Sequence, residues 1–136
     1  MSRAEKAKEY FLNGYACSQA VALAFADILP VEKESLEKLA LPFGGGMGRL
    51  RLTCGAVSGM AIVLGLVFSE SGADPKKKAA TYERVREVCS RFEKENGSLL
   101  CGELLEMRKQ SDHKTSCGEI VFKATEILEK YLKEQQ

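Results

Sequence analysis

The sequence lacks an excess of charge of either sign, because 20 lysine and arginine residues face 19 aspartate and glutamate residues. Proteins that bind nucleic acid or an anionic membrane surface through their electrostatic field normally carry a clear surplus of positive charge. The balance therefore gives no electrostatic argument for either partner, and we expect no binding to nucleic acid.

The sequence also lacks a targeting segment and a long hydrophobic run. Its start, Met1 to Glu9, is charged and has no apolar core of the kind that a secretory signal needs. The longest uncharged run, Leu52 to Phe68, is shorter than the ~20 residues of a membrane span, and Gly55, Gly59 and Gly65 interrupt it. We therefore expect no membrane insertion and a cytoplasmic location.

Cysteine is the residue type that the sequence has in unusual number. Five cysteines are more than a cytosolic protein needs for packing, yet too few for a disulfide-stapled domain of 136 residues. In a reducing compartment, cysteines are more often catalytic, redox-sensing or metal-binding than permanently bridged. We therefore expect the cysteines to carry the function.

Strand signals are almost absent, and apolar residues recur with the helical period along the chain. Turn and breaker residues mark the ends of the apolar segments, at Asn13-Gly14, Pro30, Pro42, Asp74-Pro75 and Gly97. The pattern predicts helices over residues 3–13, 18–29, 32–41, 55–69, 75–96, 102–109 and 118–134. Without a repeat or linker, residues 1–136 are expected to form one compact all-α bundle of about six to seven helices, with a glycine-rich loop before the fourth.

Two of the predicted helices, the second and the fourth, are apolar on nearly every side, which is typical of buried helices. The fifth has an apolar stripe and a heavily charged opposite face; the stripe consists of Ala79, Tyr82, Val85, Val88, Cys89 and Phe92. So much apolar surface in a small domain also leaves room for a homodimer interface.

Four cysteines fall at or just before a predicted helix N-terminus, namely Cys17, Cys54, Cys101 and Cys117. A helix N-terminus presents unpaired backbone N–H groups and about half a positive charge, which stabilise a thiolate over a thiol. Such placement can lower a cysteine pKa from ~8.5 into the range ~3.5–7.5. Glycine follows three of the four directly, so no side chain keeps backbone N–H groups away from the sulfur. We therefore predict that these four cysteines form the functional set.

The remaining cysteine, Cys89, falls on the apolar stripe of the fifth helix, between Val85 and Phe92. A free cysteine in that position packs as a small hydrophobic residue. We expect Cys89 to be structural.

The spacing of the four cysteines leaves their chemistry open. Neither a Cys-x-x-Cys pair nor the spacing of a zinc knuckle is present, and the closest two, Cys101 and Cys117, have fifteen residues between them. Four cysteines allow three disulfide pairings, and the same thiolates could instead hold zinc or an iron–sulfur cluster. In each case the tertiary fold must assemble the site, and scattered sulfurs would exclude both.

A glycine-rich loop, Gly44 to Arg51, precedes Cys54 by a few residues. It could cradle an anion with its N–H groups, Arg49 and Arg51, although it lacks the ending of a phosphate-binding P-loop. It could instead be a tight turn that passes close to another helix, or it could wrap the thiolate site so that Arg49 stabilises it.

Gly55 and Gly59 have helical spacing, which favours close packing of two helices, and Gly55 would also give access to a sulfur. If a cofactor is bound, we expect Gly55, Gly59 and Arg49 to contact it. The single histidine, His113, lies in a polar stretch four residues before Cys117. It could ligate a metal or act as a base, but a lone histidine has no spacing partner, so we expect a solvated loop residue.

One motif joins these features. Residues 54–59 read Cys-Gly-Ala-Val-Ser-Gly, and Phe-Gly-Gly-Gly-Met-Gly lies upstream. The other cysteines occur in Ala-Cys-Ser-Gln-Ala-Val at Cys17, Leu-Leu-Cys-Gly-Glu-Leu-Leu at Cys101 and Ser-Cys-Gly-Glu at Cys117. With these motifs the chain resembles, over nearly its whole length, the small redox-active proteins named for the pattern C-GCAxxG-C-C. Cys89 lies outside that pattern.

The resemblance implies a redox or cofactor role for the four cysteines and supplies no reaction. We favour a thiol-based redox protein, consistent with an oxidoreductase, that exchanges electrons or sulfur with a redox partner or a small thiol or sulfur species. This hypothesis needs no cofactor beyond a disulfide. The first alternative is a zinc or iron–sulfur binding module that uses the same four thiolates, and the second is a helical adaptor with inert cysteines.

Overall fold

The computed structural model describes residues 1–110 and 116–136. These residues form the α-helices α1 Arg3–Leu12, α2 Cys17–Leu23, α3 Lys33–Ala40, α4 Gly55–Phe68, α5 Pro75–Asn96, α6 Cys101–Gln110 and α7 Cys117–Glu134. Two short 3₁₀ helices, η1 Ala26–Ile28 and η2 Leu41–Phe43, follow α2 and α3. No strand occurs in the described ranges, and the predicted all-α fold is confirmed.

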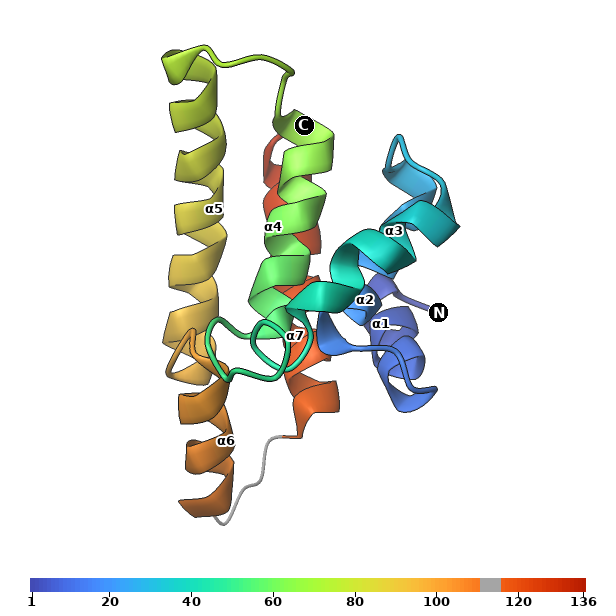
Figure 1. Ribbon diagram of the computed structural model, residues 1–136, viewed down its shortest axis with the longest axis vertical. Helices are drawn as coiled ribbons and strands as arrows, with labels where there is room; N and C mark the ends of the chain where they lie inside the picture. The colour runs from blue at the N-terminus through green and yellow to red at the C-terminus, as the bar shows by residue number, and fades with distance from the viewer. Residues whose placement is uncertain (111–115) are drawn as a thin grey trace.

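Three helices, α4, α5 and α7, lie side by side along the long axis of the molecule (Figure 1). α2 packs against α4, and α1 packs against α7 and α2. α6 continues from the end of α5 and extends beyond it, at the end of the molecule where α4 begins (Figure 1). This end therefore gathers the starts of several helices together with the loop that precedes α4.

The central helix α4 is buried because its sequence contains no charged side chain. Met60, Val63 and Leu64 are fully enclosed, and they belong to one continuous core with Val21 and Phe92. The predicted buried core helix is confirmed. Across residues 1–110 and 116–136, no helix combines the length and the apolar character that crossing a bilayer requires.

The second helix is shorter than predicted, because α2 ends at Leu23 and not at residue 29. The Phe25 N–H bonds to the carbonyl of Ala22, only three residues back, and the chain continues into η1. The Ala24 carbonyl instead accepts a hydrogen bond of 2.8 Å from the guanidinium of Arg3. A side chain of α1 thus satisfies a backbone group that a longer helix would have satisfied itself, and the local pattern does not reveal this partner.

The predicted stripe of α5 is correct only toward the end of the helix. Val88 and Phe92 are fully buried, whereas Tyr82 is 56% exposed. At the level of Tyr82, α5 turns Arg84 inward, and its guanidinium stacks 3.7 Å from the centre of the Phe68 ring. Because arginine can cover an aromatic ring while keeping its charge in water, it replaces an apolar residue on the inner face.

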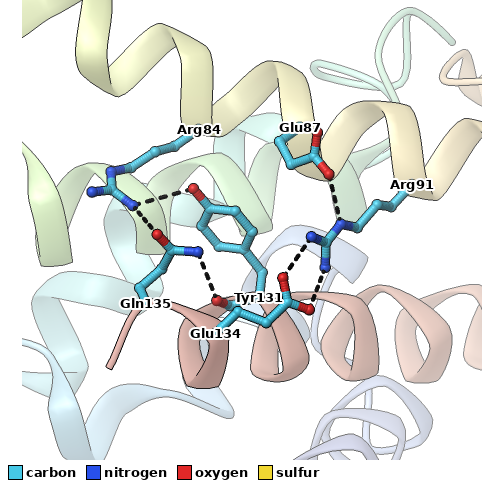
Figure 2. Close-up of polar contacts among 6 residues, drawn as sticks. All are labelled: Arg84, Glu87, Arg91, Tyr131, Glu134 and Gln135. Atoms are coloured by element: carbon cyan, nitrogen blue, oxygen red, sulfur yellow. Dashed lines mark hydrogen bonds and ion pairs between the residues drawn. The ribbon is translucent and has the colours of Figure 1, made fainter.

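Hydrogen bonds between polar side chains join α5 to α7 (Figure 2). Arg84 donates to the Tyr131 hydroxyl at 3.2 Å and to Gln135 Oε1 at 3.1 Å. Further along α5, Arg91 forks onto the carboxylate of Glu134 with bonds of 2.7 and 3.1 Å. These contacts fix how α7 lies along α5, and so they help to position the start of α7 near the start of α6.

Candidate redox site

The four predicted cysteines line one cavity of ≈ 650 Å³, and none of them is in a disulfide. Cys17, Cys101 and Cys117 are the first residues of α2, α6 and α7, and Cys54 is the N-cap of α4, so their predicted placement at helix starts is confirmed. Cys89 lies on α5 and does not line the cavity. The fold thus gathers four thiols that are distant in the sequence.

Cys17 is held by the capped start of α2 and packs against α4. The backbone N–H of Ala16 donates to Gln19 Oε1 at 2.9 Å, which fixes the first turn of α2. A Cβ atom added to Gly55 would overlap the Cys17 sulfur, so this glycine is what lets α2 begin so near α4. The N–H groups of Gly45 and Ser18 point at the same sulfur.

Cys54 is the most enclosed of the four, with 6% of its surface exposed. The N–H groups of Ala56 and Val57, in the first turn of α4, face its sulfur and favour its ionised form. They do not complete a capping hydrogen bond with it. The N-terminus of α4 therefore stabilises the ionised form of this thiol electrostatically, without a capping hydrogen bond.

A short antiparallel pairing brings the start of α6 beside the start of α4. One isolated β-bridge joins the two segments that precede these helices. On either side of it, the Cys54 N–H donates to the Leu99 carbonyl at 2.8 Å and the Cys101 N–H donates to the Leu52 carbonyl at 2.7 Å. Backbone bonds thus hold Cys54 and Cys101 at the same end of the molecule.

Cys101 and Cys117 each accept a hydrogen bond from an arginine. The guanidinium of Arg51 lies 3.6 Å from the Cys101 sulfur, and that of Arg108 lies 3.0 Å from the Cys117 sulfur. No cation of the described residues makes such a bond to Cys17, which is half-buried, or to Cys54, which is buried. The four thiols therefore divide into two with a guanidinium and two without.

The predicted lowering of the cysteine pKa is wrong for Cys17 and Cys54. Burial raises the pKa of Cys17, and the N–H groups of Gly45 and Ser18 lower it by less. Burial also raises the pKa of Cys54 to about 12, and the charge of Cys17 is the second cause. Removing these sulfurs from water disfavours their charged form more than the helix ends favour it. Both are therefore thiols at neutral pH.

The electrostatic environment of Cys17 includes the other three cavity cysteines, and that of Cys54 includes Cys17 and Cys101. The charges of Cys117 and Cys101 both act to raise the pKa of Cys17, and the charge of Cys17 acts in the same direction on Cys54. Each of the other three sulfurs is therefore close enough to interact with it. Closeness of the cysteines is a requirement for any reaction that passes a disulfide from one cysteine to another.

The glycine-rich loop adopts a left-handed path. Residues 45–49 all have φ between +56° and +75°, and Arg51 follows with φ of +62°. Glycine takes such angles freely, whereas Met47, Arg49 and Arg51 each do so at a cost of about 1–2 kcal/mol. The Gly48 N–H closes the loop with a bond of 2.9 Å to the Pro42 carbonyl, six residues back.

This loop forms one wall of the cavity. Arg49 and Arg51 line the cavity together with Gly44, Gly45 and Gly48. The loop also approaches α6 so closely that a Cβ atom on Gly46 would lie 2.7 Å from the Cβ of Cys101. The geometry thus combines a tight turn against another helix with a wrapping of the cysteine site, but the loop guanidinium that reaches a sulfur is that of Arg51 and not the predicted Arg49.

The two glycines named as cofactor contacts have different places. Gly55 lines the cavity, and its missing side chain makes room for Cys17. Gly59 does not line the cavity but lies between α2 and α4, where a Cβ atom would come 2.8 Å from the Ser18 carbonyl oxygen. Gly59 therefore serves the close packing of two helices.

The geometry gives the metal hypothesis no support. No three His, Cys, Asp or Glu side chains in the described parts of the chain are arranged so that they could hold one metal ion. The four sulfurs share a cavity without converging on one metal position. His113, which we expect to be a solvated loop residue, lies outside the described residues.

The walls of the cavity are mostly apolar, and the charges in it are basic. Large apolar side chains come from α1, from the segment between α1 and α2, from η2, from α6 and from α7, namely Phe11, Tyr15, Leu41, Leu104, Leu105 and Ile120. The charged groups are those of Arg49, Arg51 and Arg108. A cavity of this size and composition suits a small organic molecule.

The residue that sequence reasoning missed is Arg108. The signal was present, because Arg108 lies seven residues after Cys101 on one helix, which is two turns along the same face. A basic residue two turns after a cysteine at a helix start is thus a sequence signal for this position, although the sulfur that Arg108 contacts is that of Cys117 on α7.

Comparison with known proteins agrees with this arrangement of cysteines. Residues 15–131 match a family described as "Putative redox-active protein (C_GCAxxG_C_C)". An uncharacterized protein of Archaeoglobus fulgidus is 29% identical over 151 aligned positions, which cover 100% of this chain and 99% of that relative. No solved structure matches the chain at a significant level. Since the family match includes all four cavity cysteines and the loop that wraps them, the chain belongs to the C_GCAxxG_C_C family.

Proposed function

We propose that the protein is a thiol–disulfide redox protein that exchanges electrons through Cys17, Cys54, Cys101 and Cys117. The supporting observation is that four cysteines from four helix starts line one cavity as free thiols. Thiols that share a cavity can pass a disulfide among themselves and to one bound substrate, which scattered thiols cannot do. The redox description of the family supports the same conclusion.

Cys101 and Cys117 are the residues that meet the oxidised substrate first in this proposal. Both are half-buried, and each has a guanidinium within hydrogen-bond reach of its sulfur. A positive charge in that position stabilises the negative charge that a sulfur carries when it attacks or leaves. Cys17 and Cys54, whose pKa values are raised, stay protonated at this stage.

The proposed step is an exchange with a small disulfide. A thiolate of Cys101 or Cys117 attacks one substrate sulfur, the substrate S–S bond breaks, and the first substrate thiolate leaves. Cys17 then attacks the protein sulfur of the mixed disulfide, which releases the second substrate thiolate. One internal disulfide has formed, two protein thiols have lost two electrons, and their protons end on the two released thiols. We assign this role to Cys17 because Cys101 and Cys117 both act on its pKa and it acts in turn on that of Cys54, while all four cysteines line one cavity.

Disulfide mapping tests this function. Reduced protein is treated without oxygen with one equivalent of a small disulfide, then alkylated, digested and analysed by mass spectrometry. We expect one internal disulfide that contains Cys17, while Cys89 remains alkylated. The variant Cys17→Ser should stop at a mixed disulfide on Cys101 or Cys117.

The variant Cys89→Ser is the matched control, because Cys89 lies outside the cavity. It should form the same internal disulfide as the unchanged protein. Five fully alkylated cysteines after treatment, or mixed disulfides without any internal one, would overturn the proposal.

A further inference from the structure

The charge that lines the cysteine cavity has one sign. Arg49, Arg51 and Arg108 line it, and no aspartate or glutamate of residues 1–110 and 116–136 does. The chain as a whole is nearly neutral, with 20 basic and 19 acidic residues, so this excess is local. A cleft with apolar walls and charge of one sign focuses its field and attracts ligands of the opposite charge. The cavity therefore favours an anion.

None of these three arginines forms a salt bridge with a carboxylate within the described ranges, and two of them, Arg49 and Arg51, belong to the glycine-rich loop. There, the arginine salt bridges are formed by Arg3 and Arg91. Arg51 makes only the long contact of 3.6 Å to the Cys101 sulfur, and both Arg49 and Arg51 are exposed. A guanidinium offers five donors in a planar fork that matches a carboxylate. Those donors are available to a ligand that enters the cavity.

The backbone supplies an independent argument for the same two residues. Arg49 and Arg51 have φ of +65° and +62°, a conformation that is strained for any residue except glycine. The loop uses glycine at most of its other left-handed positions, so glycine would fit here too. Strained residues of this kind gather at binding sites, where the side chain is needed in one place.

The chemistry of the cavity also limits the size and shape of the ligand. Leu104, Leu105 and Ile120 provide an apolar surface for a short carbon chain. The Arg51 guanidinium lies beside the Cys101 sulfur, so an anionic group held there places the rest of the ligand within reach of a thiol. A molecule with a sulfur centre, a short chain and a terminal carboxylate satisfies all three features.

We propose that the substrate of the cavity is a small organic disulfide that carries negative charge, bound through Arg49 and Arg51. This inference rests on the proposed thiol–disulfide function and adds the chemical class of its substrate. The anionic end of the disulfide binds the guanidinium groups, its chain lies on the apolar wall, and its S–S bond faces Cys101 and Cys117. The exchange consumes one anionic disulfide, converts two protein thiols to one disulfide, and releases two anionic thiols.

Three disulfides of similar length but different charge test the inference. They are 3,3′-dithiodipropionate, which is dianionic, bis(2-hydroxyethyl) disulfide, which is neutral, and cystamine, which is dicationic. The rate of loss of protein thiols is measured with each one. Dividing each rate by the rate with the protein unfolded in urea removes the intrinsic reactivity of the disulfide.

We expect the corrected rate to be highest for the dianion and lowest for the dication. An exposed ion pair is worth up to about 1 kcal/mol, so each guanidinium removed should lower the ratio of dianion to neutral rates by up to about fivefold. Arg49→Gln and Arg51→Gln should both lower this ratio. Arg49→Gln should change the rate with the neutral disulfide less, whereas Arg51→Gln also removes the guanidinium beside Cys101 and should slow all three disulfides, so the ratio is its readout. Arg86→Gln is the matched control, because Arg86 is exposed on α5 and does not line the cavity.

A measurement on the unchanged protein protects the test against variants that fold poorly. Added salt screens exposed charges, so the preference for the dianion should decrease between low and high ionic strength. If none of the three disulfides oxidises the protein, the proposed function itself fails. If all three react at equal corrected rates, or if the Arg49→Gln/Arg51→Gln double variant keeps the full preference, the function stands and the inference about the anion is wrong.

Discussion

A single methyl group added at Gly55 should show how closely Cys17 packs on the start of α4. The Cβ atom of an alanine there would lie nearer than 3.0 Å to the Cys17 sulfur and 3.0 Å from the Phe43 carbonyl oxygen. One obstacle is backbone, and the other is a half-buried side chain at the first turn of α2. The two helices must therefore move apart, and overpacking of this kind costs about 1–3 kcal/mol.

The same helix offers a matched control in Gly65. A Cβ atom at Gly65 meets nothing within 4 Å, so Gly65→Ala gains only the helix propensity of alanine, about 0.5–1 kcal/mol. Gly55 is the first residue of α4 and gains less from alanine than an interior position, so the overlap with Cys17 is isolated by the double-mutant cycle and not by this difference alone. We expect Gly65→Ala to raise the free energy of unfolding and Gly55→Ala to lower it, with a gap of about 1–3 kcal/mol.

Urea unfolding of the reduced protein, followed by circular dichroism, measures the gap, and a double-mutant cycle assigns it. Removing the sulfur with Cys17→Ala should restore most of the stability lost in Gly55→Ala, with a coupling energy of about 1–2 kcal/mol. In thermal unfolding, each kcal/mol corresponds to roughly 3–5 °C for a domain of this size. Equal stabilisation by both alanines, or a coupling energy of zero, would refute the packing of Cys17 against α4.

Three other substitutions test the loop, the buried thiol and the core. The Cβ atom of an alanine at position 46 would lie 2.7 Å from the Cβ of Cys101, whereas one at position 48 meets nothing within 4 Å. Gly46→Ala should therefore lower the unfolding free energy by about 1–3 kcal/mol more than Gly48→Ala. Equal losses of stability would contradict the contact between Gly46 and Cys101. Burial raises the pKa of Cys54 to about 12 in the folded protein, compared with ~8.5 in the unfolded chain. The contribution of the neutral Cys54 thiol to the unfolding free energy is therefore complete below the unfolded pKa and is lost as the pH rises toward the folded pKa. The unfolding free energy should therefore fall more steeply above pH 9 in the unchanged protein than in Cys54→Ala, and parallel curves would contradict the raised pKa. Phe92→Ala should cost about 3–5 kcal/mol in urea unfolding, and a loss below about 1 kcal/mol would contradict its full burial.

The helix starts could be predicted from the sequence because their signals are local. Asp74 before Pro75 and Gly97 after Asn96 mark both ends of α5, and the structure places the helix between them. The end of α2 could not be predicted in the same way, since a hydrogen bond from Arg3 on another helix satisfies the Ala24 carbonyl. A cap formed by residues next to the helix end can be recognised in the sequence, whereas a hydrogen bond from a side chain of another helix cannot.

In the candidate site, too, the features with local sequence signals could be predicted and those that depend on packing between helices could not. Glycine after a cysteine predicted open access to sulfur, but the sulfur that Gly55 makes room for is Cys17 on another helix, and not its neighbour Cys54. The pKa prediction was wrong for Cys17 and Cys54 for a related reason. Helix position can be estimated from sequence, whereas burial, which dominates the pKa of both, depends on how the helices pack.

Burial also gives the proposed reaction its order. A thiol attacks a disulfide only as its thiolate, so Cys17 and Cys54, which burial keeps protonated, react slowly with a disulfide in solvent. Attack at Cys101 or Cys117 places the mixed disulfide in the same cavity as Cys17. The reaction of Cys17 with it is then intramolecular, and its high effective concentration compensates for the small fraction of thiolate. The proposed order of the steps therefore follows from the raised pKa values of Cys17 and Cys54 and from the guanidinium groups beside Cys101 and Cys117. Burial and the charge of Glu93 also raise the pKa of Cys89. Because Cys89 does not line the cavity of the other four cysteines in the described chain, no mixed disulfide forms beside it, and it should react slowly.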